Sequence, residues 1–221
     1  MARFRRLETL QTIGSSGLVP IFYNSDVEVA VNVAEAVHRG GSRILEFTNR
    51  GEEATTVFRE LVARCRKNLP DLILGIGTVS DPATAALYLG LGADFIVSPV
   101  LCPDVIRVAN RRKIPVLPGC GSATEIASAE ELGCEIIKVF PADALGGPNF
   151  IRAILGPSPW SSLMPTGGVS PSNLAEFLSL PSVLACGGSW LTPADAVAAG
   201  NYDEITRLAA EAVAIAKKVR G

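Results

Sequence analysis

One lysine inside an apolar run is the residue of this chain best suited to chemistry. Lys138 stands between Ile137 and Val139, in a stretch of β-branched and aromatic residues that is typical of a buried strand. Lysine is rarely buried in full, and burial lowers the pKa of its ammonium group because the charged form loses its hydration. A neutral amine in an enclosed site attacks carbonyl carbons. Lys138 is therefore a candidate nucleophile, and the alternative is a strand-end lysine that extends its head to water.

Three other polar side chains follow short apolar runs of the same kind. Glu46 is a candidate general base, or else a solvated charge at the end of a strand. Arg50 carries a planar fork that suits a carboxylate, although a surface ion pair would use it equally well. Thr78 has a hydroxyl that could donate to the same carboxylate or cap a helix.

Two glycine pairs stand in short loops later in the chain. Gly167 and Gly168 follow Pro-Thr, and Gly188 and Ser189 belong to Cys-Gly-Gly-Ser. Free backbone N–H groups in such loops bind anions, particularly where the loop opens a helix, as we expect for both. Ordinary turn glycines are the alternative for either loop alone.

A lysine, a carboxylate, an arginine and an anion loop together predict a reaction class. Attack of Lys138 on a 2-keto acid would give a protonated imine, which accepts electrons when a nearby carbon–carbon bond breaks. Glu46 would move the proton of the substrate hydroxyl, and Arg50 would bind the carboxylate. The glycine loops would hold a terminal phosphate or carboxylate. This chemistry requires no metal and no cofactor.

Eight short apolar runs alternate with helical patterns and must position these groups. The runs cover residues 18–22, 43–47, 72–75, 94–97, 115–118, 134–142, 162–164 and 182–186. This alternation predicts an α/β fold, a (β/α)8 TIM barrel preceded by an extra helix at about residues 4–13. Active sites of such barrels lie at the carboxyl ends of the strands, and phosphates favour the loops after strands seven and eight. A doubly wound sheet is the alternative, but the fingerprint begun by Gly75 and Gly77 fails at Ser80.

Composition limits the remaining possibilities. A chain of 221 residues with 48% apolar content predicts a single domain over residues 1–221. A net charge of −2 gives no electrostatic case for nucleic acid, and no apolar run approaches the roughly 20 residues of a membrane span. Five cysteines without a C-x-x-C pair fit a reducing cytoplasm. The single histidine, His38, excludes a multi-histidine metal centre within one chain.

The motifs taken together resemble one family along nearly the whole chain. They are Val19-Pro20, Leu45-Glu46, Thr48-x-Arg50, Gly75-x-Gly-Thr-Val79, Ser98-Pro99, Lys138-x-Phe-Pro-Ala142, Pro165-Thr-Gly-Gly168 and Gly187-Gly-Ser-Trp-Leu191. In these residues the chain resembles the class I aldolases of 2-keto-3-deoxy-6-phosphogluconate (KDPG) and 4-hydroxy-2-oxoglutarate (KHG). Such enzymes release pyruvate and an aldehyde, which is glyceraldehyde 3-phosphate or glyoxylate.

The resemblance implies a homotrimer of (β/α)8 barrels, each with an added N-terminal helix, acting on a small-molecule 2-keto acid. It implies that Lys138 forms the Schiff base and that Glu46 accepts the proton. By the same resemblance, the remaining site residues bind the carboxylate (Arg50, Thr78), line the pocket (Pro99, Phe140) and hold the phosphate (Gly167, Gly168, Gly188, Ser189). Two rivals stay open: another phosphate-binding barrel, such as an isomerase or epimerase, and a sugar-phosphate-binding homologue without activity.

Overall fold

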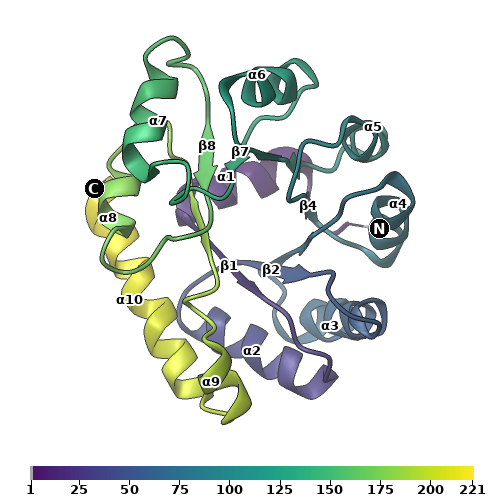
Figure 1. Ribbon diagram of the computed structural model, residues 1–221. Helices are drawn as coiled ribbons and strands as arrows, with labels where there is room; N and C mark the ends of the chain where they lie inside the picture. Colours follow the sequence, from purple (N-terminus) through teal and green to yellow (C-terminus); the bar gives the residue numbers. More distant parts are fainter. Residues whose placement is uncertain (1) are drawn as a thin grey trace.

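The computed structural model describes residues 2–221 and has an α/β fold in which every strand pairing is parallel (Figure 1). The strands are β1 (Leu18–Phe22), β2 (Ile44–Thr48), β3 (Ile73–Gly77), β4 (Phe95–Val97), β5 (Val116–Leu117), β6 (Gly119–Cys120), β7 (Ile137–Val139), β8 (Leu163–Pro165) and β9 (Cys186–Gly188). One sheet has the order β5-β4-β3-β2-β1-β9 and the other β6-β7-β8. Isolated bridges from Leu163 to Val183 and from Thr166 to Gly187 connect the two sheets.

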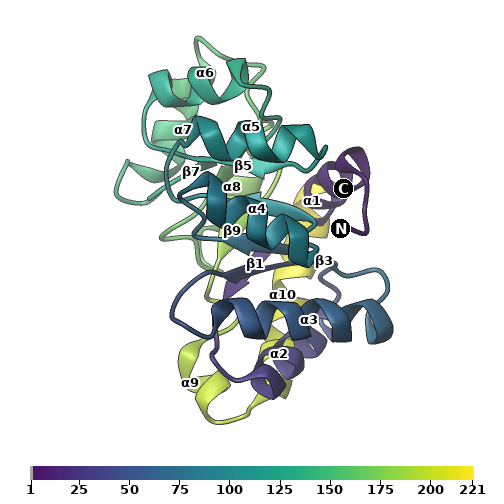
Figure 2. The ribbon, with the colours of Figure 1, turned by 90° about the vertical axis from the view of Figure 1, so that its right-hand side faces the viewer.

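Helices surround the strands in both views (Figures 1 and 2). They are α1 (Arg6–Ser16), α2 (Val27–Arg39), α3 (Ala54–Asn68), α4 (Pro82–Leu91), α5 (Pro103–Arg111), α6 (Ala123–Glu131), α7 (Gly147–Leu155), α8 (Leu174–Leu178), α9 (Ala194–Ala198) and α10 (Tyr202–Arg220). The side chains of Asp26, Asp81 and Ser122 each accept a hydrogen bond from an N–H in the first turn of α2, α4 and α6. Within residues 2–221, none of these helices combines the length and apolarity that a membrane crossing needs.

The core has two parts because strand side chains alternate between two faces. The larger part lies between the strands and the helices. The smaller part fills the space that the strands enclose, and its buried members are Ile13, Val19, Ile44, Ile73, Phe95, Val97, Leu117, Ile136, Met164 and Ala185. Ile13 belongs to α1, so this helix closes the interior at one end, as Figure 2 shows.

Most predicted elements lie within a few residues of the observed ones, and three boundaries differ. The first helix runs past Gly14 to Ser16, and Gly17 ends it with a φ of 72°. The run predicted at 115–118 is divided, because Pro118 lacks an N–H and separates β5 from β6. The strand predicted at 182–186 is β9, which begins at Cys186.

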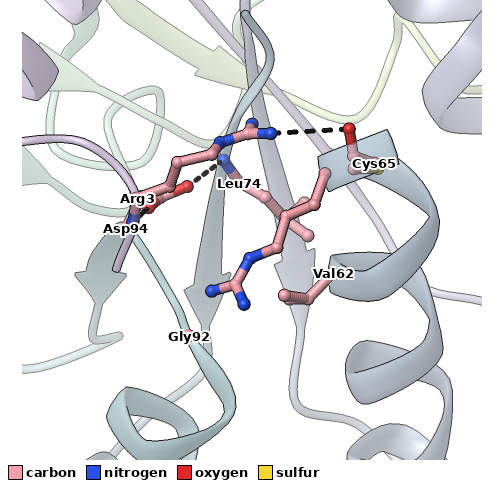
Figure 3. Close-up of a pocket in the computed structure, with 7 residues that line it drawn as sticks. Arg3, Val62, Cys65, Leu74, Gly92 and Asp94 are labelled. Carbon is pink, nitrogen blue, oxygen red and sulfur yellow. Dashed lines mark hydrogen bonds between the residues drawn. The ribbon is translucent and has the colours of Figure 1, made fainter. Parts of the chain in front are cut away.

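A buried carboxylate fastens the chain before α1 to the strands (Figure 3). Asp94 is 3% exposed, and its two oxygens accept hydrogen bonds from the backbone N–H of Arg3 (2.7 Å), Phe4 (3.4 Å) and Leu74 (3.1 Å). The Arg3 guanidinium donates to the carbonyls of Cys65 and Leu69, each at 3.5 Å, at the end of α3. One aspartate therefore joins three separate segments of the chain.

We predict that Asp94→Ala lowers the free energy of unfolding by about 3 kcal/mol, because it removes several charge-assisted hydrogen bonds and leaves a buried N–H unpaired. Urea denaturation measures this loss. The matched control is Asp104→Ala, which breaks only an exposed pair with Arg107 and should cost less than about 0.5 kcal/mol. Equal losses in the two variants would contradict this account of the N-terminal segment.

Candidate active site

A cavity of about 760 Å³ lies at the carboxyl ends of the strands. Side chains of β1, β2 and β7 line it together with loops that follow β3, β4, β8 and β9. All ten residues that the sequence indicates border this one cavity: Glu46, Arg50, Thr78, Pro99, Lys138, Phe140, Gly167, Gly168, Gly188 and Ser189. Residues up to 143 positions apart in the sequence, from Glu46 to Ser189, thus meet at the end of the fold opposite α1.

Lys138 projects into this cavity from the middle of β7. Its strand neighbours in register are Gly119 and Met164, and the residue is only 7% exposed. The Nζ atom lies 4.9 Å from the centre of the Phe140 ring. Burial lowers the pKa of Lys138, the negative charge of Glu46 opposes this, and the positive charge of Arg50 adds to it. The net lowering increases the fraction of neutral, nucleophilic amine.

Glu46, on β2, borders the same cavity as Lys138 and is 1% exposed. Burial raises the pKa of its carboxyl group, against the opposing charges of Lys138 and Arg50. Within residues 2–221 its Oε2 is buried without a hydrogen-bond partner, and no ion pair within 4.0 Å joins it to Lys138. The two charges therefore interact without a direct ion pair, and both side chains border the cavity that a reactant would enter.

The missing side chain of Gly77 leaves the space that the Glu46 carboxyl group occupies. A Cβ atom added to Gly77 would lie 1.8 Å from Oε1 of Glu46 and 2.7 Å from its carboxyl carbon. The carboxyl group therefore occupies the space that a side chain at residue 77 would need. Gly77 has no positive φ, so steric space alone explains the glycine here.

A main-chain hydrogen bond joins the loop that carries Arg50 to the loop that carries Thr78. The N–H of Asn49 donates to the carbonyl of Gly77 at 2.8 Å, which brings the loop after β2 against the loop after β3. Thr78 has a φ of 60°, a left-handed conformation that costs a β-branched residue about 1–2 kcal/mol. Arg50 lies exposed on the rim. A strained residue kept at a cavity wall is typical of a functional position.

The glycine loops border the cavity, but they do not open helices as expected. Gly167 and Gly168 have φ values of 88° and 81°, whereas α8 begins only at Leu174. The helix after β9 begins at Ala194, five residues beyond Ser189. Gly167 and Gly168 therefore offer an anion backbone N–H groups in a left-handed turn. The loop of Gly188 and Ser189 has no positive φ and offers N–H groups away from any helix end.

Sequence reasoning missed several residues of the cavity wall. Thr48 and Thr166 line it, and each has a buried hydroxyl without a hydrogen-bond partner in the described chain. Strand alternation could have found Thr48, because it lies two residues after Glu46 and so shares its face. Tyr23, Trp190 and Val197 also line the cavity. No pattern in the sequence connects α9, which carries Val197, with the lysine strand.

Comparisons with known proteins agree with this geometry. The family described as KDPG and KHG aldolase matches residues 11–208. The chain belongs to the KDPG and KHG aldolase family. It is 41% identical over 210 residues to the KHG/KDPG aldolase of Escherichia coli (strain K12), covering 95% of this chain and 96% of that relative. Membership favours carbon–carbon lyase activity over the isomerase or epimerase considered from the sequence.

Two solved aldolases share the fold. The KDPG aldolase from Legionella pneumophila, with pyruvate captured at low pH as a covalent carbinolamine intermediate, matches with a TM-score of 0.85 and 32% identity, over 91% of this chain and 96% of that one. The 2-keto-3-deoxy-6-phosphogluconate aldolase of Zymomonas mobilis ZM4 with 3-phosphoglycerate matches with a TM-score of 0.83 and 31% identity, over 93% and 94%.

We predict that Gly77→Ala abolishes most aldolase activity, at least about 100-fold, because the new methyl group must displace the Glu46 carboxyl group from its place. Activity per mole of folded protein measures this effect. Gly90→Ala is the matched control, since Gly90 lies inside α4 with no atom within 4 Å of the added Cβ. That variant should keep full activity and gain about 1 kcal/mol in stability. Full activity of Gly77→Ala would contradict the packing argument.

Proposed function

We propose that this protein is a Schiff-base aldolase that cleaves KDPG to pyruvate and glyceraldehyde 3-phosphate, KHG to pyruvate and glyoxylate, or both. The observation that carries the proposal is that the buried Lys138 and the buried Glu46 border one cavity at the strand ends. The covalent pyruvate adduct of the Legionella aldolase supports a carbonyl reaction in this family.

Lys138 and Glu46 divide the reaction between them. The neutral amine of Lys138 adds to the C2 carbonyl, and loss of water from the carbinolamine gives a protonated imine. Glu46 then takes the proton of the C4 hydroxyl, directly or through a water molecule, while the C3–C4 bond breaks. The bonding electrons move into the imine and form an enamine, and the aldehyde leaves. Protonation at C3 and addition of water release pyruvate and restore the amine.

The rest of the wall orients the keto acid. Arg50 and Thr78 bind the carboxylate of the pyruvyl half, where the guanidinium supplies the positive charge and the threonine hydroxyl a further donor. Pro99 and Phe140 line the pocket beside the reacting carbons, and the ring of Phe140 lies close to the amine of Lys138.

The glycine loops bind the far end of the substrate. Gly167, Gly168, Gly188 and Ser189 offer backbone N–H groups and one hydroxyl to a terminal phosphate or carboxylate. Among the described residues that line the cavity, only Glu46, Lys138 and Arg50 have acidic or basic side chains, so main-chain dipoles supply the binding at that end. The Zymomonas aldolase with 3-phosphoglycerate supports an anionic three-carbon ligand in this family.

The architecture is proposed in finer detail on the same basis. Residues 1–221 form one (β/α)8 barrel in which β5 and β6 count as a single strand, and α1 is the added N-terminal helix. The protein works as a homotrimer on a small-molecule 2-keto acid, without nucleic acid or membrane partners. Family resemblance supports the trimer, and a cytoplasmic location stays a prediction from the sequence.

We predict that borohydride in the presence of pyruvate adds one reduced pyruvyl group to the peptide that contains Lys138. Intact-mass and peptide mass spectrometry detect the adduct. Lys138→Ala should abolish the adduct, while Lys67→Ala, which changes an exposed lysine on α3, should keep it. An unmodified mass in the unaltered protein would disprove the imine mechanism and would favour a homologue that binds sugar phosphates without turnover.

We also predict that Glu46→Gln slows cleavage by roughly 10²–10⁴-fold, because the amide cannot accept the hydroxyl proton. Imine trapping should persist in this variant. Because the Glu46 charge raises the pKa of Lys138, its removal should shift the acidic limb of trapping to lower pH.

A pH series of trapped protein measures this shift in Glu46→Gln, and steady-state pyruvate release measures the turnover. Glu131→Gln, at the exposed end of α6, is the matched control and should leave both quantities unchanged. Unaltered turnover in Glu46→Gln would remove Glu46 from the role of base.

A further inference from the structure

A buried tyrosine behind the cavity wall donates a short hydrogen bond to the loop after β2. The hydroxyl of Tyr88, on α4, lies 2.7 Å from Oδ1 of Asn49. Tyr88 is 0% exposed and does not line the cavity, so it touches no substrate. Asn49 separates Thr48, on the cavity wall, from Arg50, on its rim.

Packing fixes the position of the tyrosine ring. The rings of Tyr88 and Phe58 meet edge to face with centres 5.2 Å apart, and Phe58 lies 6.1 Å from Phe47 on β2. Among residues 2–221, the one other hydrogen-bond neighbour of the Tyr88 hydroxyl is Thr55, at 3.5 Å. Burial raises the pKa of Tyr88, so the hydroxyl keeps its proton and acts as a donor. Asn49 is thus its principal partner.

The main chain of Asn49 links the Tyr88 hydrogen bond to Thr78 on one side and to Arg50 on the other. Its N–H donates to the carbonyl of Gly77, the residue before Thr78, at 2.8 Å. Its own successor is Arg50, whose N–H donates to the carbonyl of Thr48 at 2.9 Å. One residue therefore connects the two groups proposed to bind the substrate carboxylate, and Tyr88 holds that residue from behind.

The strained turn at Thr78 makes such support necessary. A threonine at a φ of 60° relaxes unless neighbouring contacts hold it. Helix α4 begins four residues after Thr78, at Pro82, and the Asp81 side chain caps it by accepting from the N–H of Thr84 at 2.8 Å. The cap thereby anchors α4, the helix that carries Tyr88, next to the turn. Helix α3, which carries Phe58, lies beside α4 in Figure 1.

We infer that Asn49 and Tyr88 are positioning residues that set the spacing between Arg50 and Thr78 for the carboxylate of the keto acid. The inference rests on the proposed function, because it concerns how that carboxylate is held. It assigns to this hydrogen bond an effect on carboxylate affinity and none on the reactivity of Lys138.

The experiment measures borohydride trapping against carbonyl concentration, with pyruvate and with acetone, which lacks the carboxylate. In Tyr88→Phe the half-saturating pyruvate concentration should rise about fivefold, the range of one neutral hydrogen bond. The extent of trapping at saturation and the acetone curve should stay unchanged. Tyr202→Phe is the matched control, since it removes a hydroxyl at the start of α10, outside this network.

Asn49→Leu and the double variant complete a thermodynamic cycle. Each should show the same rise of about fivefold as Tyr88→Phe, because all three break one bond. Multiplied effects in the double variant, or an acetone curve that shifts with the pyruvate curve, would overturn the inference. Equal pyruvate curves for Tyr88→Phe and the unaltered protein would overturn the inference and leave the proposed function standing. Failure of the unaltered protein to trap pyruvate would overturn the proposed function as well.

Discussion

The withdrawal of one lysine from water is the constraint on which this structure depends. Lys138 on β7 has lost most of its hydration, and within the described chain the carboxyl group of Glu46 borders the same cavity without an ion pair to it within 4.0 Å. A direct ion pair would return the amine to its charged form and close the gap that a substrate needs. The fold holds the two groups on separate strands, β2 and β7, so the backbone and not the side chains alone sets their relative position.

The arrangement depends on glycines as well as on the reactive side chains, because the glycines leave room for neighbouring groups. Gly77 gives its side-chain space to the carboxyl group of Glu46, and Gly75 gives its space to the ring of Phe95. Gly119, beside Lys138 on the neighbouring strand, allows the carbonyl of Pro99 to approach. Missing side chains on β3 and β6, the strands paired with β2 and β7, therefore make room for the groups packed beside the glutamate and the lysine.

The sequence predicted the chemistry better than it predicted the supports. An apolar run with one lysine, and repeated strand–helix alternation, were sufficient to bring Lys138, Glu46 and Arg50 to one end of a parallel fold, because parallel strands expose their carboxyl ends on the same side. The position of α9, the left-handed turn at Thr78 and the bond from Tyr88 to Asn49 depend on contacts between segments far apart in the chain. Local periodicity contains no information on such contacts. The division of one strand at Pro118 has a local cause, the missing N–H, which the periodicity of apolar residues does not register.

The smaller, apolar part of the core, between the cavity and α1, limits how reactants enter and leave the enzyme. Ile13 of α1 and the ring of Phe95 belong to a tightly filled interior. Among the described residues, this interior gives reactants no passage from the cavity toward α1. Reactants therefore arrive and leave at the carboxyl ends of the strands, where the cavity lies. In the proposed mechanism the pyruvyl fragment is still bound to Lys138 when the carbon–carbon bond breaks, so the aldehyde leaves first. The water that then releases pyruvate enters from the same end of the strands.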